Sequence, residues 1–213
     1  MFNRLADLLT DPGTRTARFE LGLFALMALS MMATREHHFS SVLHLADTSW
    51  AVFFMAGLYL RPRWMLAALI ALALSVDLFA VWHDGLALSG CFTPAYPGLL
   101  LAYGALWAFG RKTRQDWTQL QTTPHDQWMM PLVLVGSAML GVLSAFVLSN
   151  LTFWGFSGHF DAMPLSEYTH RVMGYLSGYL ATTLVDTGFA VALIMGWVTI
   201  TTRHSDSHTA KSA

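Results

Sequence analysis

The run from Pro131 to Ser149, PLVLVGSAMLGVLSAFVLS, contains no charged residue over nineteen positions. A helix needs about 20 apolar residues to cross roughly 30 Å of hydrocarbon. The rest of the chain has the same character, because 54% of its 213 residues are hydrophobic and only 12% are charged, whereas soluble domains have about 25% charged residues. The sequence therefore predicts an all-α integral membrane protein.

Hydropathy divides the chain into six predicted membrane spans that form one helical bundle over residues 19–202. Residues 1–18 are predicted to be a cytoplasmic segment with a short interfacial amphipathic helix. Residues 203–213 are predicted to be a disordered cytoplasmic tail, because they are polar and lack a core. The second and fourth spans are short in apolar residues, so we expect flanking turns such as Val42–Ser49 to extend them. The predicted spans are Phe19–Ala33, Trp50–Leu60, Trp64–Val81, Gly98–Gly110, Pro131–Ser149 and Tyr175–Thr202.

Lysine and arginine are unevenly distributed over the connections between these spans. Alternate connections and termini place ten of them on one side of the membrane and two, Arg35 and Arg171, on the other. Because cytoplasmic segments are enriched in Lys and Arg, both termini are predicted to be cytoplasmic. Three connections then face outward: Arg35–Ser49, Trp82–Pro97 and Asn150–Gly174, the longest in the chain. Such aromatic, Gly- and Pro-containing loops are typical of a ligand-binding surface over a bundle.

Cys91, in LALSGCFTPAYPG, is the single cysteine of the chain and lies in the second outward connection. It cannot form an internal disulfide, and an exposed thiol on the outer side of a membrane is open to oxidation. A thiolate is a soft ligand for zinc, copper(I), iron–sulfur clusters, haem iron or cobalt. The alternative interpretation is a buried small apolar residue.

Histidines supply a second set of candidate ligands on the outward side. His37 and His38 follow the first span, and His83 lies eight residues before Cys91. The alternative is that these side chains lie at the lipid–water boundary with their polar ends in water. No histidine lies well inside a span, which argues against a bis-histidine haem cytochrome.

Four further polar residues are candidates for a site. An acid within a span is costly, so Asp77 and Asp186 are expected to be functional or paired. We interpret Asp77, near the outer end of its span, as a ligand contact and Asp186 as a helix-packing residue. Arg171 could neutralise a ligand or pair with Glu167 one helical turn earlier. Tyr96 could form an aromatic wall beside a planar ligand or belong to an interfacial belt.

Several function classes lack their motifs in this chain. There is no GxxxxGK[ST], so no nucleotide site of the P-loop type is predicted. No HExxH or GxSxG sequence indicates a hydrolase. The formal net charge of −1 gives no overall field that would recruit nucleic acid.

Six spans, cytoplasmic termini, about 200 residues and a site under outward loops resemble the substrate-binding S-components of energy-coupling-factor (ECF) vitamin transporters. More specifically, the chain resembles the BtuM-type cobalamin transporters of Gram-negative bacteria. The residues that carry this resemblance are the cysteine of GCFTPAYPG with Tyr96 five positions later, His38, Asp77, and the SNLTFW…EYTHR segment with Arg171. The resemblance extends from about Phe19 to Arg203.

The resemblance implies that the chain binds cobalamin (vitamin B12) on the periplasmic face and carries it across the bacterial inner membrane. Cys91 would ligate the cobalt of cobalamin, with His38 as a second candidate ligand. Tyr96, His38, Asp77 and Arg171 would line the pocket around the corrin ring. Ligation by the thiolate could also displace an upper axial ligand such as cyanide, which would make Cys91 a catalytic residue.

The first span, ELGLFALMALSMMA, lacks the AxxxA stripe with which many S-components dock on a shared ATP-driven module. The resemblance therefore favours a carrier that acts without such a module. Two alternatives stay open. The chain could be an S-component for another vitamin, with Cys91 incidental, or a haem- or metal-binding membrane redox protein.

Overall fold

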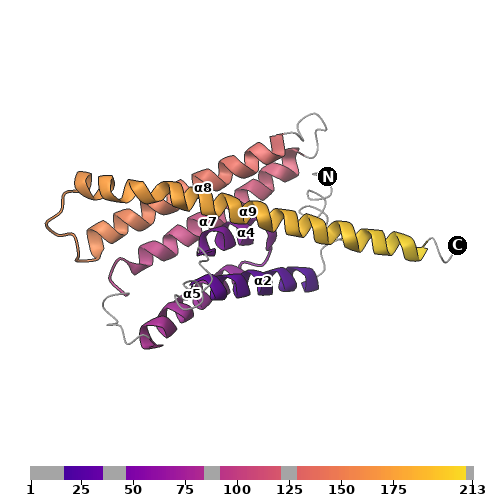
Figure 1. The fold of residues 1–213 in the computed structure, drawn as a ribbon, viewed down its shortest axis with the longest axis horizontal. Coiled ribbons are helices and arrows are strands. Elements are labelled where there is room, and N and C mark those ends of the chain that lie inside the picture. Colours follow the sequence, from indigo (N-terminus) through magenta and orange to yellow (C-terminus); the bar gives the residue numbers. More distant parts are fainter. Residues whose placement is uncertain (1–16, 36–46, 84–91, 121–128, 210–213) are drawn as a thin grey trace.

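The computed structural model describes residues 17–35, 47–83, 92–120 and 129–209. Within these ranges all regular structure is helical, which confirms the all-α prediction for this part of the chain. The helices (Figure 1) are α2 (Ala17–Arg35), α4 (Ser49–Tyr59), α5 (Trp64–His83), α7 (Tyr96–Leu120), α8 (Met130–Phe156) and α9 (Leu165–Thr209).

Prolines mark the beginnings of several helices. Pro97 and Pro131 are the second residues of α7 and α8, and Pro164 directly precedes α9. Proline is tolerated in the first turn because the N–H groups there have no partner within the helix. Pro62 lies in the short connection between α4 and α5, where its carbonyl accepts a hydrogen bond from the N–H of Met65 (3.2 Å).

Helix α4 is the centre of the bundle. It contacts α2, α5, α7, α8 and α9, and every one of its 11 residues is buried. At 1.5 Å per residue it is about 16 Å long, which is too short to cross a bilayer alone. The expected extension by residues 42–46 lies outside the described residues.

Two glycines let α4 and α7 approach closely. A Cβ atom at Gly57 of α4 would collide with the carbonyl group of Trp107, and one at Gly110 of α7 would collide with the carbonyl oxygen of Phe54. The contacts are therefore between backbones. Close helix approach through small residues, a common device in membranes, thus occurs here between α4 and α7.

Within the described part of the chain, three segments are long and apolar enough to cross a membrane: Trp64–His83, Met130–Phe156 and Leu165–Ile194. Large apolar side chains cover their outer surfaces, with Leu132 61%, Val185 69% and Phe189 66% exposed. An apolar exterior of this kind is compatible with hydrocarbon and unfavourable in water. These helices support the prediction of a membrane protein.

The predicted long outward loop over Asn150–Gly174 is wrong. Helix α8 continues to Phe156 and α9 begins at Leu165, so the connection is Ser157–Pro164. No glycine or proline lies between Ser149 and Gly155, and the amide of Asn150 donates to the carbonyl of Phe146 (2.9 Å) within the helix. The turn contains Gly158, whose φ of 74° is the left-handed conformation that glycine adopts readily.

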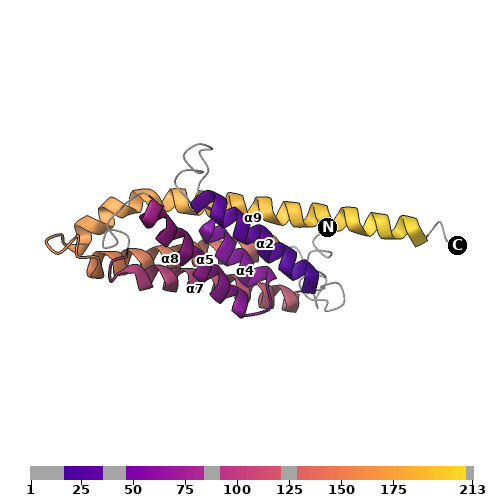
Figure 2. The ribbon, with the colours of Figure 1, turned by 90° about the horizontal axis from the view of Figure 1, so that it is seen from below.

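The C-terminal helix is longer than the predicted sixth span of Tyr175–Thr202. Helix α9 runs for 45 residues and extends past the other helices (Figures 1 and 2). Residues 203–209, predicted to belong to a disordered tail, continue this helix. The sequence RHSDSHT contains neither proline nor glycine, so it holds no residue that ends a helix.

Candidate functional site

A buried ion pair joins the end of α2 to α5. The guanidinium of Arg35, 9% exposed, donates from Nε to Asp77 Oδ1 (2.6 Å) and from Nη2 to Asp77 Oδ2 (2.7 Å). Two parallel hydrogen bonds to one carboxylate are the strongest form of this pairing. The two residues lie 42 positions apart in the chain, so the pair ties α2 to α5.

Tyr96, the first residue of α7, adds a third helix to this pair. Its hydroxyl donates to Asp77 Oδ2 at 2.6 Å. The turn before α7 fixes its position, because the N–H of Tyr96 donates to the carbonyl of Thr93 (2.9 Å) and its ring stacks on Phe92 with centroids 4.6 Å apart. The structure thus brings together two predicted site residues, Asp77 and Tyr96.

The remaining face of the Arg35 guanidinium points to α4 and α7. Its Nη1 donates to the hydroxyls of Tyr103 (2.6 Å) and Ser49 (3.0 Å) and lies 3.8 Å from Asp47. The ring of Tyr103 stacks on Phe53 of α4, with centroids 4.2 Å apart and planes 10° apart. Arg35 therefore links four helices.

We call Arg35, Ser49, Asp77, Tyr96 and Tyr103 the polar network. Hydrogen bonds to described residues use four of the five guanidinium N–H groups of Arg35 and three of the roughly four lone-pair positions of Asp77. The Tyr103 hydroxyl accepts from Arg35 and donates to none of the described residues. The network can thus still donate and accept a few hydrogen bonds, which matches an amide-bearing ligand.

A cavity of about 220 Å³ lies beside the network, between α2, α4 and α9. Its lining is apolar except for Asp186 and two hydroxyl residues, Ser30 and Thr48, whose oxygens are 3.0 Å apart. This volume is below the roughly 300–1,000 Å³ of pockets for drug-sized ligands, and neither Asp77 nor Tyr96 lines the cavity. Asp186, interpreted above as a helix-packing residue, faces this cavity.

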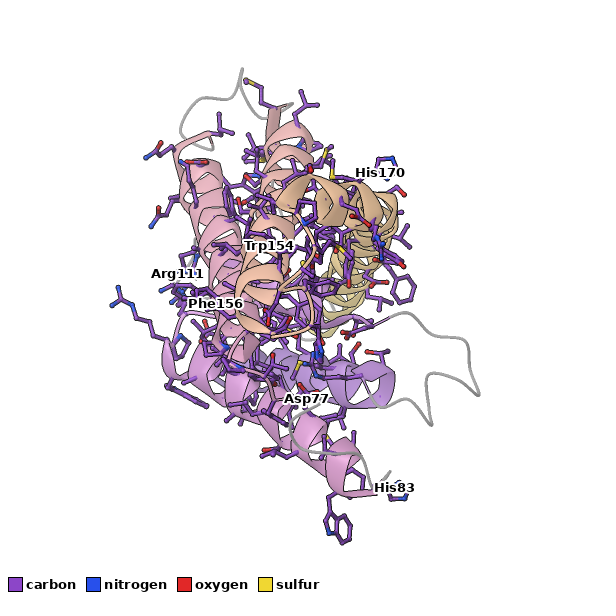
Figure 3. All side chains as sticks on the ribbon, turned by 90° about the vertical axis from the view of Figure 1, so that its left-hand side faces the viewer. Asp77, His83, Arg111, Trp154, Phe156 and His170 are labelled. Atoms are coloured by element: carbon purple, nitrogen blue, oxygen red, sulfur yellow. The ribbon has the colours of Figure 1, made fainter. Side chains whose placement is uncertain are left out.

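Arg171 does not join the polar network. Its Nη2 donates to Glu167 Oε1 at 2.6 Å on the exposed surface of α9, with the two side chains 60% and 50% exposed. Of the two interpretations of Arg171, a ligand contact or a pair with Glu167, the structure shows the pair. Its neighbour His170 lies at the edge of the bundle away from Asp77, as Figure 3 shows.

The other predicted ligands are only partly placed. Cys91, His37 and His38 lie outside the described residues. Among the residues that the structure describes, no three His, Cys, Asp or Glu side chains gather into a metal site. His83 lies at the end of α5, beyond Asp77 (Figure 3), and stacks on Phe79.

Three members of the network, Arg35, Ser49 and Tyr103, are not among the predicted site residues. Arg35 enters the sequence predictions only as one of two basic residues on the outward side. Its position on the outward side indicated a specific role, because the enrichment of basic residues on the cytoplasmic side does not explain an arginine there. Tyr103 had no comparable signal, since a tyrosine within an apolar span is common in a helical core.

The polar network is thus a neutralised Arg–Asp pair that two tyrosines and one serine surround at one end of the bundle. Such an arrangement can hold a rigid polar floor beneath a ligand and offer it a few hydrogen bonds. A scan against protein-family models finds no match to this chain, and a search of the curated proteins finds none either.

Proposed function

We propose that this chain binds cobalamin at the end of the bundle that carries the polar network and transports it across the membrane. The observation that supports this most is the 2.6 Å hydrogen bond between Tyr96 and Asp77. It joins two residues that the resemblance assigns to one corrinoid pocket, although they belong to different helices. Cys91, the proposed cobalt ligand, directly precedes Phe92, and Phe92 stacks on Tyr96.

The proposed topology is a six-span bundle of the S-component type with both termini in the cytoplasm of a bacterium. Its support is the direction of the helices. Helices α2 and α5 end where α4 and α7 begin, because Arg35, Asp77, Ser49 and Tyr96 share one network. The Thr152 side chain near the end of α8 lies against Gly98 near the start of α7. Successive helices thus alternate in direction, and the predicted ligand-binding connections share the face proposed to be periplasmic.

The polar network suits the peripheral groups of cobalamin. The corrin ring carries several carboxamide arms, which both donate and accept hydrogen bonds. Arg35, Asp77 and Tyr103 keep both donor and acceptor positions that no described residue uses, and burial strengthens each such bond relative to water. The Tyr96 ring offers a flat apolar surface beside the ring system. Arg171, exposed on α9, is proposed to contact an arm that extends from the pocket.

Cobalt is part of the transported substrate in this proposal. The Cys91 thiolate forms a sulfur–cobalt bond, which adds affinity and selects corrinoids over other flat ligands. His38 is the second candidate for an axial contact. A change in the bundle then opens the site toward the cytoplasm. Because α2 lacks an AxxxA stripe, we propose that the chain acts without a shared ATP-driven module.

We further propose that ligation by Cys91 removes an upper axial cyanide. The thiolate gives its electron pair to Co(III), the cobalt–carbon bond breaks, and cyanide leaves with its own electron pair and takes a proton from water. The cobalt keeps its oxidation state, so no reductant or oxidant is needed. The protein would then keep the corrinoid as a thiolate complex until release.

Growth on imported cobalamin tests the proposed function. In a strain that depends on cobalamin uptake, the wild-type chain is expected to rescue growth and Cys91→Ala to fail, because the cobalt ligand is lost. Ser75→Ala is the matched control, since Ser75 is exposed on α5 and bonds only to the carbonyl of Ala71 among described residues. Rescue by Cys91→Ala equal to that by wild type would contradict a role for Cys91 as cobalt ligand. Failure of the wild-type chain to rescue growth would contradict cobalamin transport and favour another vitamin.

A further inference from the structure

Four arginines gather at the end of the bundle opposite the polar network. Arg61 and Arg63 lie in the connection between α4 and α5, and Arg111 and Arg114 lie on α7. We call these four residues the basic cluster. Arg114 is within electrostatic range of Arg111 and Arg61, and Arg111 is within range of Arg63. Among the described carboxylates, Glu20 approaches them, 3.6 Å from the Nε of Arg61.

The basic cluster is separate from the proposed ligand site. Glu20 and Arg35 are fifteen residues apart on α2, which is about 22 Å along a helix. The eight residues from Tyr103 to Arg111 on α7 span about 12 Å. The distribution of Lys and Arg predicts that this end of the bundle is cytoplasmic.

Arg111 has a structural role in the cluster. Its Nη1 donates to the carbonyls of Leu60 (2.8 Å) and Arg61 (3.1 Å), and Nη2 also donates to Arg61 (3.1 Å). These are carbonyl groups at the end of α4, which have no partner within the helix. The guanidinium also lies 5.1 Å from the ring centroid of Trp107. Arg111 therefore holds α4 against α7.

Arg114 and Arg63 have no such role in the part of the chain that the structure describes. The Arg114 guanidinium is half-buried and makes no hydrogen bond to a described residue, whereas Arg63 is exposed. Burial, followed by the positive charges of Arg111 and Arg61, lowers the pKa of Arg114 below its usual value. Glu20 supplies one negative charge against the four positive charges of the cluster, so a further anion among these arginines would be favourable.

The surroundings of the cluster indicate where that anion comes from. Trp64, the first residue of α5, follows Arg63 and is 56% exposed. Its ring lies 5.9 Å from that of Phe24 on α2, centroid to centroid. Tryptophan beside a basic residue at a helix end is typical of the headgroup region of a bilayer. A phosphate at Arg63, beside this tryptophan, belongs most simply to a lipid.

We propose that the basic cluster is a binding site for the phosphate group of an anionic phospholipid, with Arg63 and Arg114 as the residues that contact the phosphate oxygens. Guanidinium groups recognise phosphate through paired N–H donors. Basic pockets between helices on the cytoplasmic side are suited to such headgroups. This proposal does not depend on the identity of the transported ligand.

The test is lipid binding by the full chain, purified in detergent, with native mass spectrometry as the readout. Phosphatidylglycerol is compared with phosphatidylcholine of the same acyl chains, because both carry a phosphate but only the first is anionic. We expect preferential retention of phosphatidylglycerol, and a roughly fivefold weaker affinity for each of Arg63→Gln and Arg114→Gln. Lys112→Gln is the matched control, since Lys112 is 66% exposed and pairs with Asp116 at 3.0 Å.

Three results would overturn the proposal. One is equal retention of the two lipids by the wild-type chain. Another is a loss of preference in Lys112→Gln as large as in Arg114→Gln, which would indicate a general effect of charge. The third is displacement of the lipid by millimolar inorganic phosphate, which would show a site for free anions. Circular dichroism of each variant separates lost binding from lost folding, and Arg63→Gln, at an exposed position, keeps the test valid if Arg114→Gln unfolds.

Discussion

Replacing Arg35 with methionine is expected to destabilise the folded bundle by about 3–5 kcal/mol, because the change leaves the Asp77 carboxylate in a low-dielectric interior without its charge partner. Three donors to Asp77 become one, the Tyr96 hydroxyl. Ser49 and Tyr103 also lose their bonds to the guanidinium. Thermal unfolding of the detergent-solubilised protein measures the effect.

Two controls make this result specific. The double variant Arg35→Met, Asp77→Leu removes both charges and is expected to recover much of the stability. A double-mutant cycle of these two substitutions should therefore show strong coupling. Arg171→Met removes an equally charged partner from the exposed Arg171–Glu167 pair and should change stability by less than about 1 kcal/mol. Additive effects of the two inner substitutions would contradict a direct Arg35–Asp77 interaction.

Gly110→Ala is expected to lower the thermal midpoint by several degrees, through an overpacking cost of about 1–3 kcal/mol. The added methyl group would collide with the carbonyl oxygen of Phe54 and lie 2.9 Å from the backbone nitrogen of Leu58. Backbone atoms cannot rotate away as a flexible side chain can. The helices α4 and α7 must therefore separate, which loosens the centre of the bundle.

Gly104→Ala is the matched control on the same helix. No atom outside the local backbone lies within 4 Å of a Cβ at this position. Alanine is a better helix former than glycine, so this variant should be neutral or stabilised by up to about 1 kcal/mol. An equal loss of stability in both variants would show that glycine matters for α7 itself rather than for its contact with α4.

The sequence predicted which residues take part in polar contacts better than it predicted their partners. An acid near the end of an apolar span predicted that Asp77 would be functional or paired, and the structure pairs it with Arg35. Which basic residue pairs with it could not be predicted, because the two lie 42 positions apart and hydropathy contains no information on which helices touch. Arg171 illustrates the opposite case, since its partner Glu167 is one helical turn away and the spacing alone names it.

Helix ends were less predictable than the existence of helices. Polar residues after the apolar run from Pro131 to Ser149 suggested a loop, but Asn150 and Thr152 bond to carbonyls of their own helix, which continues to Phe156. Polar side chains that donate to carbonyls of the preceding turn let a helix continue through a polar stretch. The first span lacks an AxxxA stripe, whereas Gly57 and Gly110 make the close approach between α4 and α7.

The most direct test of the central claim is the visible spectrum of cyanocobalamin on incubation with the purified chain. Ligation of cobalt by the Cys91 thiolate and loss of the upper cyanide change the ligand field, so we expect the absorption bands to shift and free cyanide to be released in equal amount. The Ser75→Ala protein should behave as wild type. Cys91→Ala should produce neither the shift nor the cyanide. An unchanged spectrum with the wild-type chain, or the same shift with Cys91→Ala, would contradict a cobalt–thiolate site.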